Sequence, residues 1–234
     1  MKNLIIFGIF ILALVFAQFA GAQTVDDVIN KHIEAMGGKD KMMSLTSLKM
    51  SGSFNVQGTD VSMVITRKHM VGSRADISVM GTENYQLITP AKGSVFMPIQ
   101  GQSEPQAMPD DQLKTGQTQL DLQGPFINYK EKGNTISLVG KETIDGTECY
   151  KLQVTFKNGA HTDYYISTKD NRIYKTSTKL NINGEDTDVE TVYSNYKQNA
   201  DGFWFPYTTT SLRGETNYDT IETNIAVDDK IFKD

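Results

Sequence analysis

The pattern of apolar and polar residues changes twice along the chain. Residues 4–19 are almost wholly apolar, residues 25–36 carry apolar side chains at helical spacing, and most of the remainder alternates with a period of two. A period of two places successive side chains on opposite faces of a strand, so each strand has one apolar and one polar face. The pattern therefore predicts a leader, one opening helix and a long series of strands.

The leader, residues 1–22, has the three parts of a secretory signal. Lys2 supplies the charged start, the apolar run follows, and Ala20-Gly21-Ala22 provides the small residues before the cleavage site. The apolar run is shorter than the roughly 20 residues that span a bilayer, which favours a removed signal peptide over a retained anchor. No cysteine follows the cleavage site, so we expect a soluble, periplasmic chain without a lipid anchor.

The opening helix has recognisable start and stop signals. Thr24 can cap its first turn, with Asp27 as the partner in a capping box. Gly37-Gly38 ends it, because glycine takes the left-handed conformation that closes a helix. A second, short helix is expected over residues 39–44.

Alternating segments fill most of residues 47–225. The clearest case is Tyr150, Leu152, Val154 and Phe156, which alternate with polar residues. Turn dipeptides separate the segments: Gln57-Gly58, Asp145-Gly146, Asn158-Gly159, Asn183-Gly184 and Asp201-Gly202. Connections this short join antiparallel neighbours. The pattern predicts a mainly β fold of about ten or eleven antiparallel strands with a few helices, and residues 23–234 are interpreted as a single domain.

The segment from Met97 to Pro125 interrupts this rhythm with four prolines and many glutamines. It is interpreted either as a lid, with a helix starting at Pro109, or as a polar loop. One helix and such a lid cannot cover a sheet this large, so the sheet is expected to curl into an unclosed barrel around an apolar hollow. The residues expected to line that hollow are Met50, Phe54, Met63, Ile65, Leu152, Val154, Phe156 and Trp204.

Composition excludes several classes of protein. The chain of 234 residues has 23 basic and 28 acidic residues, and this acidic balance argues against nucleic acid or an anionic membrane surface as the main partner. A single cysteine, Cys149, excludes an intrachain disulfide and is interpreted as a small strand residue.

The sequence carries no recognisable motif for catalysis or for metal or cofactor binding. His32, His69 and His161 lie far apart in the sequence, and no zinc, phosphate-loop, dinucleotide or nucleophile-elbow motif occurs. His161 and Asp163 lack a paired nucleophile. Asp186, Asp188 and Glu190 fall on one strand face and are interpreted as solvated. We therefore expect no enzyme activity, no metal and no cofactor.

Several short motifs, in order along the chain, resemble the bacterial outer-membrane lipoprotein-sorting proteins, the LolA-like family. They are Glu34-Ala35-Met36-Gly37-Gly38, Leu138-Val139-Gly140-Lys141-Glu142-Thr143-Ile144-Asp145-Gly146, Asp163-Tyr164-Tyr165-Ile166, Gly202-Phe203-Trp204-Phe205-Pro206 and Asp228-Asp229-Lys230-Ile231-Phe232. The resemblance implies an unclosed antiparallel barrel with a helical plug or lid over a cavity for lipoprotein acyl chains. It also implies inner-membrane release and outer-membrane acceptor proteins as partners.

The resemblance further suggests one lid contact. The best-studied carriers of the family have an arginine on an early strand that helps to hold the lid closed. Arg67 lies at the corresponding place, although Thr66 and Lys68 depart from the family pattern, and an exposed strand arginine is the alternative interpretation. The predicted function is that of a monomeric carrier of lipoprotein acyl chains or other lipids across the periplasm. A non-catalytic interaction or structural module of the envelope, with its cavity filled by its own lid, is the alternative.

Overall fold

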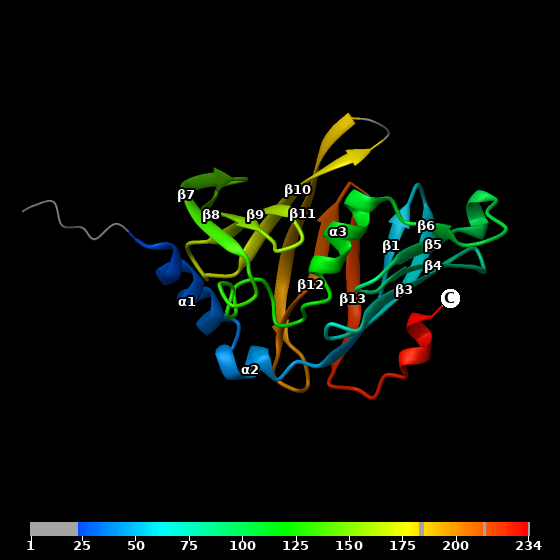
Figure 1. The fold of residues 1–234 in the computed structure, drawn as a ribbon, viewed down its shortest axis with the longest axis horizontal. Coiled ribbons are helices and arrows are strands. Elements are labelled where there is room, and N and C mark those ends of the chain that lie inside the picture. The colour runs from blue at the N-terminus through cyan, green and yellow to red at the C-terminus, as the bar shows by residue number, and fades with distance from the viewer. Residues whose placement is uncertain (1–22, 183–184, 213, 234) are drawn as a thin grey trace, which may run out of the picture.

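All described strands belong to one antiparallel sheet. The computed structural model describes residues 23–182, 185–212 and 214–233, and the predicted signal peptide lies outside them. The thirteen strands are ordered β6-β5-β4-β3-β2-β1-β13-β12-β11-β10-β9-β8-β7. Two meanders, β1 to β6 and β7 to β13, are therefore joined where the first and last strands pair, and the sheet ends at β6 and β7 without closing (Figure 1).

The strands differ widely in length. Their bounds are β1 Ser47–Val56, β2 Thr59–Lys68, β3 Gly72–Val79, β4 Thr82–Ile88, β5 Gly93–Phe96, β6 Gln106–Ala107, β7 Thr135–Ile144, β8 Thr147–Thr155, β9 His161–Ser167, β10 Ile173–Ile182, β11 Glu185–Gln198, β12 Trp204–Ser211 and β13 Gly214–Thr223. The count exceeds the ten or eleven expected from the sequence. The four-residue β5 and the two-residue β6 are too short to show an alternation, and β6 lies within the segment interpreted as irregular.

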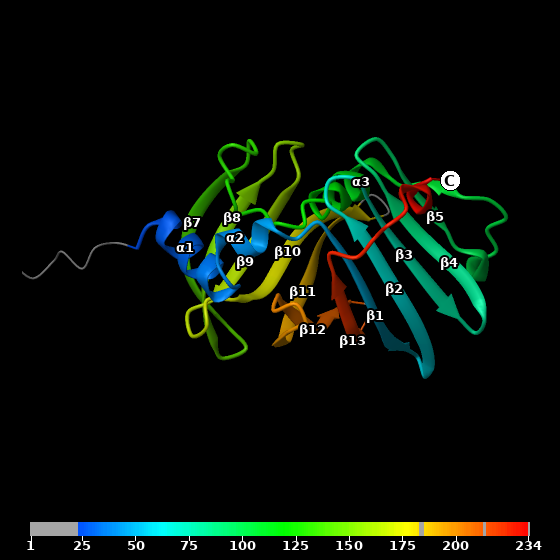
Figure 2. The same cartoon turned by 90° about the horizontal axis from the view of Figure 1, so that it is seen from below.

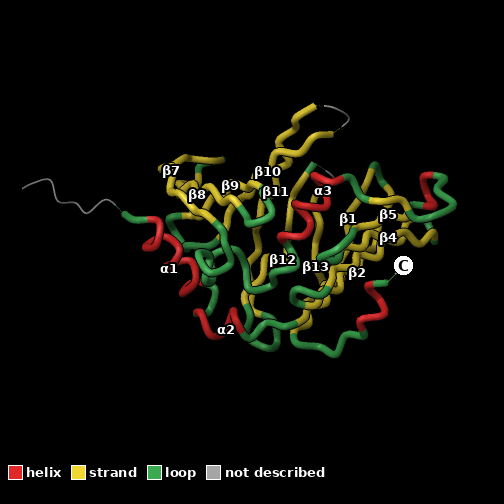
Figure 3. Tube along the Cα trace, viewed as in Figure 1, coloured by secondary structure: helices red, strands yellow, loops and turns green. Residues whose placement is uncertain are grey.

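Three α-helices and two short 3-10 helices accompany the described strands (Figure 3). They are α1 Val25–Ala35, α2 Lys39–Met43, α3 Asp110–Thr118, η2 Pro98–Gln100 and η3 Asp229–Phe232. The predicted capping box is confirmed, because the backbone N–H of Asp27 donates to Thr24 Oγ1 at 3.1 Å and that of Thr24 donates to Asp27 Oδ2 at 2.9 Å. In the described part of the chain, no helix combines the length and apolar character that crossing a bilayer requires.

The sheet is strongly curved. Helix α3 contacts both β4 and β10, although six strands lie between these two in the sheet order. A flat sheet places strands about 4.8 Å apart, so one helix reaches both only if the sheet bends around it. Figures 1 and 2 show the sheet curving with α3 on its inner side, and α1 and α2 beside β7, β8 and β9.

Helix α1 fills one end of the concave face. Val28 and Ile29 are 1% and 3% exposed and pack in a cluster with Phe126 and with inward-facing residues of β7 to β9. The strand residues in that cluster are Ile136, Leu152, Val154 and Ile166. At about 1.5–3 kcal/mol for each large side chain fully buried, this cluster accounts for much of the helix docking.

The C-terminal segment packs on the opposite, convex face. Asp229 forms an ion pair with Lys68, with 2.7 Å between Lys68 Nζ and Asp229 Oδ1. Lys68 faces away from the hollow, unlike its neighbour Arg67. A Cβ atom at Gly72 would lie 2.5 Å from the ring of Phe232, so only glycine allows this close approach. The C-terminal 3-10 helix therefore covers part of the convex face at β3.

Candidate functional site

A cavity of about 480 Å³ lies between the concave face of the sheet and the helices that cover it. Strands β1, β2 and β9 to β13 form its wall, while α1, α2, α3 and residues 119–126 cover it. Figure 2 shows α3 lying between the two halves of the sheet, above this wall. The curvature inferred from the strand-to-helix ratio is thus present, and the interior is not completely filled.

The wall combines an apolar and a polar part. The apolar part comes from α2, strands β1, β2 and β12, and residues next to the helices and strands: Met36, Met42, Leu45, Leu48, Met50, Ile65, Phe203, Trp204 and Phe205. The polar part comes chiefly from β9 to β13: Thr162, Tyr164, Thr176, Thr178, Thr191, Tyr193, Tyr196, Thr209 and Tyr218. The cavity is therefore more polar than the sequence predicted. Threonine and tyrosine fit the pleated surface of a strand as well as aliphatic residues do, so they can occupy inward positions of the sheet.

Arg67 places a cation inside this cavity. Its Nε donates to Ser73 Oγ at 3.2 Å, and its Nη2 donates to Gln119 Oε1 at 2.6 Å, directly after α3. Burial lowers the pKa of Arg67, although the phenols of Tyr218 and Tyr193 oppose this effect. The side chain is half-buried and lines the cavity.

Four tyrosines of the wall were not anticipated as site residues. Burial is the main cause that raises the phenol pKa of Tyr164, Tyr193 and Tyr196. Tyr193 Oη lies 3.1 Å from Thr176 Oγ1, and Tyr196 Oη donates to the carbonyl of Ile173 at 2.9 Å. Asn195 has a positive φ of 55°, which shifts the alternation of inward side chains within β11. Tyr193 and Tyr196 therefore both face the cavity although they are three residues apart, which a strict period of two does not predict.

Helix α3 lies against the cavity and is tied in its middle and near its C-terminal end. Asn158, in the β8–β9 turn, donates to the carbonyl of Lys114 at 2.8 Å, and Gln117 donates to the carbonyl of Pro90, after β4, at 3.0 Å. Gly116 lies against Ile88, where a Cβ atom would come within 2.4 Å of Cδ1. This glycine lowers helix propensity but lets α3 approach the sheet. Of the two interpretations of residues 97–125, the lid fits this geometry.

Residues 119–126, the strap that follows α3, are held by a polar cluster. The N–H of Leu122 donates to His69 Nδ1 at 3.2 Å, and Asp121 forms an ion pair with Lys132 at 2.6 Å. Burial lowers the pKa of His69, whereas Asp121 raises it. The cluster ties the strap to the turn between β2 and β3 and neutralises the carboxylate of Asp121, which lines the cavity.

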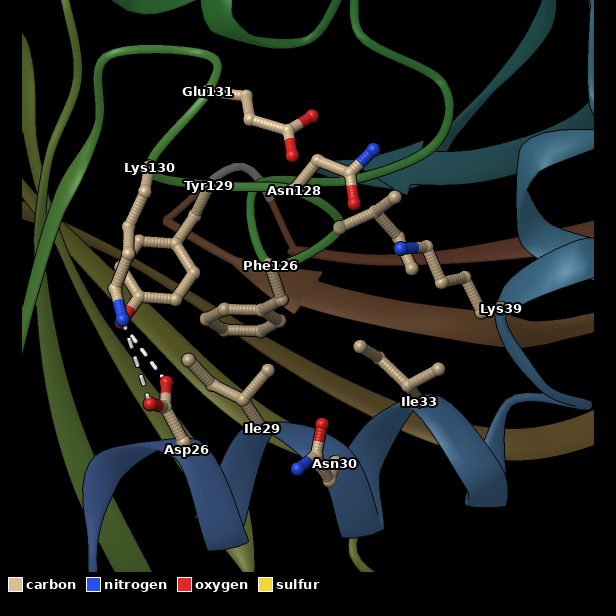
Figure 4. A pocket seen from close by; sticks show the side chains of 11 residues that line it. Asp26, Ile29, Asn30, Ile33, Lys39, Phe126, Asn128, Tyr129, Lys130 and Glu131 are labelled. Carbon is tan, nitrogen blue, oxygen red and sulfur yellow. Dashed lines mark hydrogen bonds and ion pairs between the residues drawn. The ribbon is translucent and has the colours of Figure 1, made fainter.

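Phe126 separates the cavity from a smaller pocket of about 240 Å³ beside α1. Figure 4 shows its ring next to Ile29, with Lys130 reaching Asp26 across the pocket. The ring is 2% exposed and makes edge-to-face contacts with His32 and Tyr164, each at 5.2 Å between centroids. His32 donates from Nδ1 to the carbonyl of Asn171, and burial lowers its pKa to about 4.

The residues expected from the sequence to line the hollow fall into three groups. Met50, Ile65, Trp204 and the lid candidate Arg67 lie on the cavity wall. Leu152, Val154 and Phe156 belong to the packed cluster under α1, because the helix occupies that end of the concave face. Phe54 and Met63 share the inner face of β1 and β2 but lie farther along these strands than the lining residues.

The polar groups considered for chemistry lie elsewhere. His161 and Asp163 are on the outer face of β9, with His161 Nε2 3.8 Å from Asp163 Oδ1. Asp186, Asp188 and Glu190 are exposed on β11, and Glu190 pairs with Lys175 at 2.6 Å. Across the described residues, no group of three or more histidines, cysteines or carboxylates is placed to hold a metal ion.

Two solved structures resemble this chain over almost their whole length. A LolA superfamily protein from Nitrosomonas europaea has a TM-score of 0.55 and 17% identity, with 91% of this chain and 99% of that chain covered. A DUF1329 family protein from Desulfovibrio piger ATCC 29098 has a TM-score of 0.57 and 13% identity, with 91% and 98% covered. No protein-family model and no curated protein matches the chain. The shared fold confirms the mainly β, unclosed barrel expected from the sequence.

Proposed function

We propose that this protein is a periplasmic carrier that binds the acyl chains of lipoproteins, or of another lipid, in the cavity between the sheet and α3. The observation that carries the proposal is the cavity itself, at about 480 Å³ and with many apolar side chains in its wall. Pockets that bind small ligands occupy roughly 300–1,000 Å³. In this view the carrier is monomeric and passes its cargo between membrane proteins that release and accept it.

The energetics suit reversible binding. Burying one methylene contributes about 0.8 kcal/mol, so about 14 buried carbons would contribute on the order of 11 kcal/mol before the cost of ordering the chain. Met36, Met42 and Met50 line the apolar part, and their unbranched side chains can adapt to chains of different shape. Adaptable walls hold a chain without the close packing that would prevent its release.

The same cavity suggests how release is controlled. We infer that the bond from Arg67 to Gln119 helps to hold α3 over the cavity, in keeping with the lid contact expected from the sequence. An acyl chain that enters between α3 and the sheet has to displace or deform this contact. The ties from Asn158 and Gln117 then serve as the two fixed points of the lid.

Native mass spectrometry of protein purified from an envelope extract tests the proposal. We expect a bound acylated species that is released by solvent extraction and identified by fragmentation. Met50→Trp, which fills the apolar part, should lose this species. Met80→Trp, at a position that is 81% exposed, should keep it. Folded protein without any bound or acquired lipid would instead support an interaction module whose cavity is closed by its own lid.

A further inference from the structure

Arg67 is an uncompensated cation in a partly apolar cavity. Among the described residues it has no carboxylate within ion-pair distance, and its hydrogen-bond acceptors are the neutral Ser73 and Gln119. The carboxylate that shares the cavity, Asp121, is already paired with Lys132. A charge removed from bulk water without an opposite charge is costly, so such a position favours an anionic ligand.

The guanidinium of Arg67 also has N–H donors that form no hydrogen bond within the described residues. Arginine carries five N–H donors in a planar fork, and only two bonds from this side chain occur within the described residues. The fork matches a carboxylate or a phosphate, which accepts two parallel hydrogen bonds. Gln119 offers a single neutral acceptor at the end of the lid helix, so an anion bound here would compete with it.

The wall around Arg67 adds neutral donors and an adjacent apolar surface. Tyr218 and Tyr193 lie near enough to influence the Arg67 guanidinium electrostatically, and the Tyr218 hydroxyl has no hydrogen-bond partner among the described residues. Strand β1 lies between the strands of Arg67 and Tyr218; its Leu48 pairs with Arg67, and Met50 follows on the same face. One end of a ligand would thus meet a cation and phenols while the rest lay on aliphatic side chains.

We propose that the cavity selects amphiphiles with an anionic head group, which Arg67 binds together with Tyr218 while the acyl chain lies against Leu48, Met50 and Ile65. This inference rests on the proposed function, because it names the chemical class that the lipid-binding cavity prefers. The shared chemistry is an acyl chain with one anionic group, whether the carboxylate of a fatty acid or the phosphate of a lipid.

Three ligands with the same sixteen-carbon chain, palmitate, hexadecyl phosphate and hexadecanol, test the inference. Their affinities are measured by titration calorimetry below the micelle concentration. The wild-type chain should bind at least one anion about tenfold or more tightly than the alcohol, since hydrogen bonds to charged groups are the stronger class. Whichever anion binds more tightly identifies the preferred head group.

Matched variants locate the preference. Arg67→Met should lower the affinity for the preferred anion about tenfold relative to that for hexadecanol, because loss of the lid contact acts on all three ligands alike and only the anions lose a charged partner; Tyr218→Phe should give a smaller loss in the same direction. Lys68→Met removes the neighbouring cation on the opposite face and should change none of the affinities. Circular dichroism checks that each variant is folded.

The outcomes separate the two proposals. Equal wild-type affinity for the alcohol and both anions would overturn the head-group inference while supporting lipid binding. An equal loss for all three ligands in Arg67→Met would also overturn it, because Arg67 would then act on the cavity as a whole. Failure of all three ligands to bind the wild-type chain would overturn the lipid carrier and this inference together.

Discussion

Replacing Phe126 with alanine tests whether its ring is the wall between the two pockets. The ring is 2% exposed, lies in the main core cluster and contacts two other rings edge-to-face. Phe→Ala substitutions in cores cost about 3–5 kcal/mol, and each edge-to-face contact contributes about 0.5–1.5 kcal/mol of such totals. We therefore expect Phe126→Ala to lower the free energy of unfolding by about 4 kcal/mol.

The loss should be measured by equilibrium urea unfolding, followed by the fluorescence of Trp204, the single tryptophan of the chain. Phe126→Leu keeps most of the apolar volume and is the control, with an expected cost of less than about 1.5 kcal/mol. Addition of palmitate should restore part of the lost stability in Phe126→Ala, because the merged cavity is larger. A loss below about 1 kcal/mol for Phe126→Ala would refute the assignment of Phe126 as a packed dividing wall.

Three further predictions concern other parts of the fold. Burial lowers the pKa of His32 to about 4 in the folded chain, against an ordinary value of 6.5. Between pH 6.5 and 4 the unfolded chain therefore binds one proton at this residue that the folded chain does not, and the free energy of unfolding falls as the pH drops through this range. His32→Gln should remove on the order of 3 kcal/mol of that decline in pH-dependent urea unfolding, and an unchanged profile would contradict it. Burial raises the pKa of Cys149 to about 11, so a maleimide at pH 7 should label it only after unfolding, and rapid labelling of the native chain would be inconsistent with the packing. Gly72→Ala should cost about 1–3 kcal/mol in thermal unfolding through its clash with Phe232, and less in a Phe232→Ala background; equal costs in both backgrounds would exclude this contact.

The regular parts of the fold could be predicted from local patterns. The capping box at Thr24, the alternation in β8 and the Asp145-Gly146 turn, with positive φ at both residues, all act through neighbours in sequence. Short-range signals of this kind need no knowledge of the tertiary structure. The antiparallel order within each meander follows from the same short connections.

The arrangement of the cavity depends on contacts between distant segments, and the sequence shows these poorly. Leu152 and Met50 look alike as apolar strand residues, yet α1 covers the first and leaves the second on the cavity wall. Tyr193 and Tyr196 both face the hollow because the backbone at Asn195 shifts the alternation. The dividing role of Phe126 depends on the strap after α3, whose path no periodicity indicates.

Quenching of Trp204 by a brominated acyl chain tests most directly whether lipid enters this cavity. Bromine quenches tryptophan fluorescence at short range, and Trp204 lies on the cavity wall, stacked at 3.8 Å under the guanidinium of Arg172. We predict saturable quenching by dibromostearate, no quenching by stearate, and displacement of the brominated chain by excess stearate. Dibromostearate that binds in calorimetry without quenching Trp204, or that does not bind at all, would contradict a lipid site between the curved sheet and its lid.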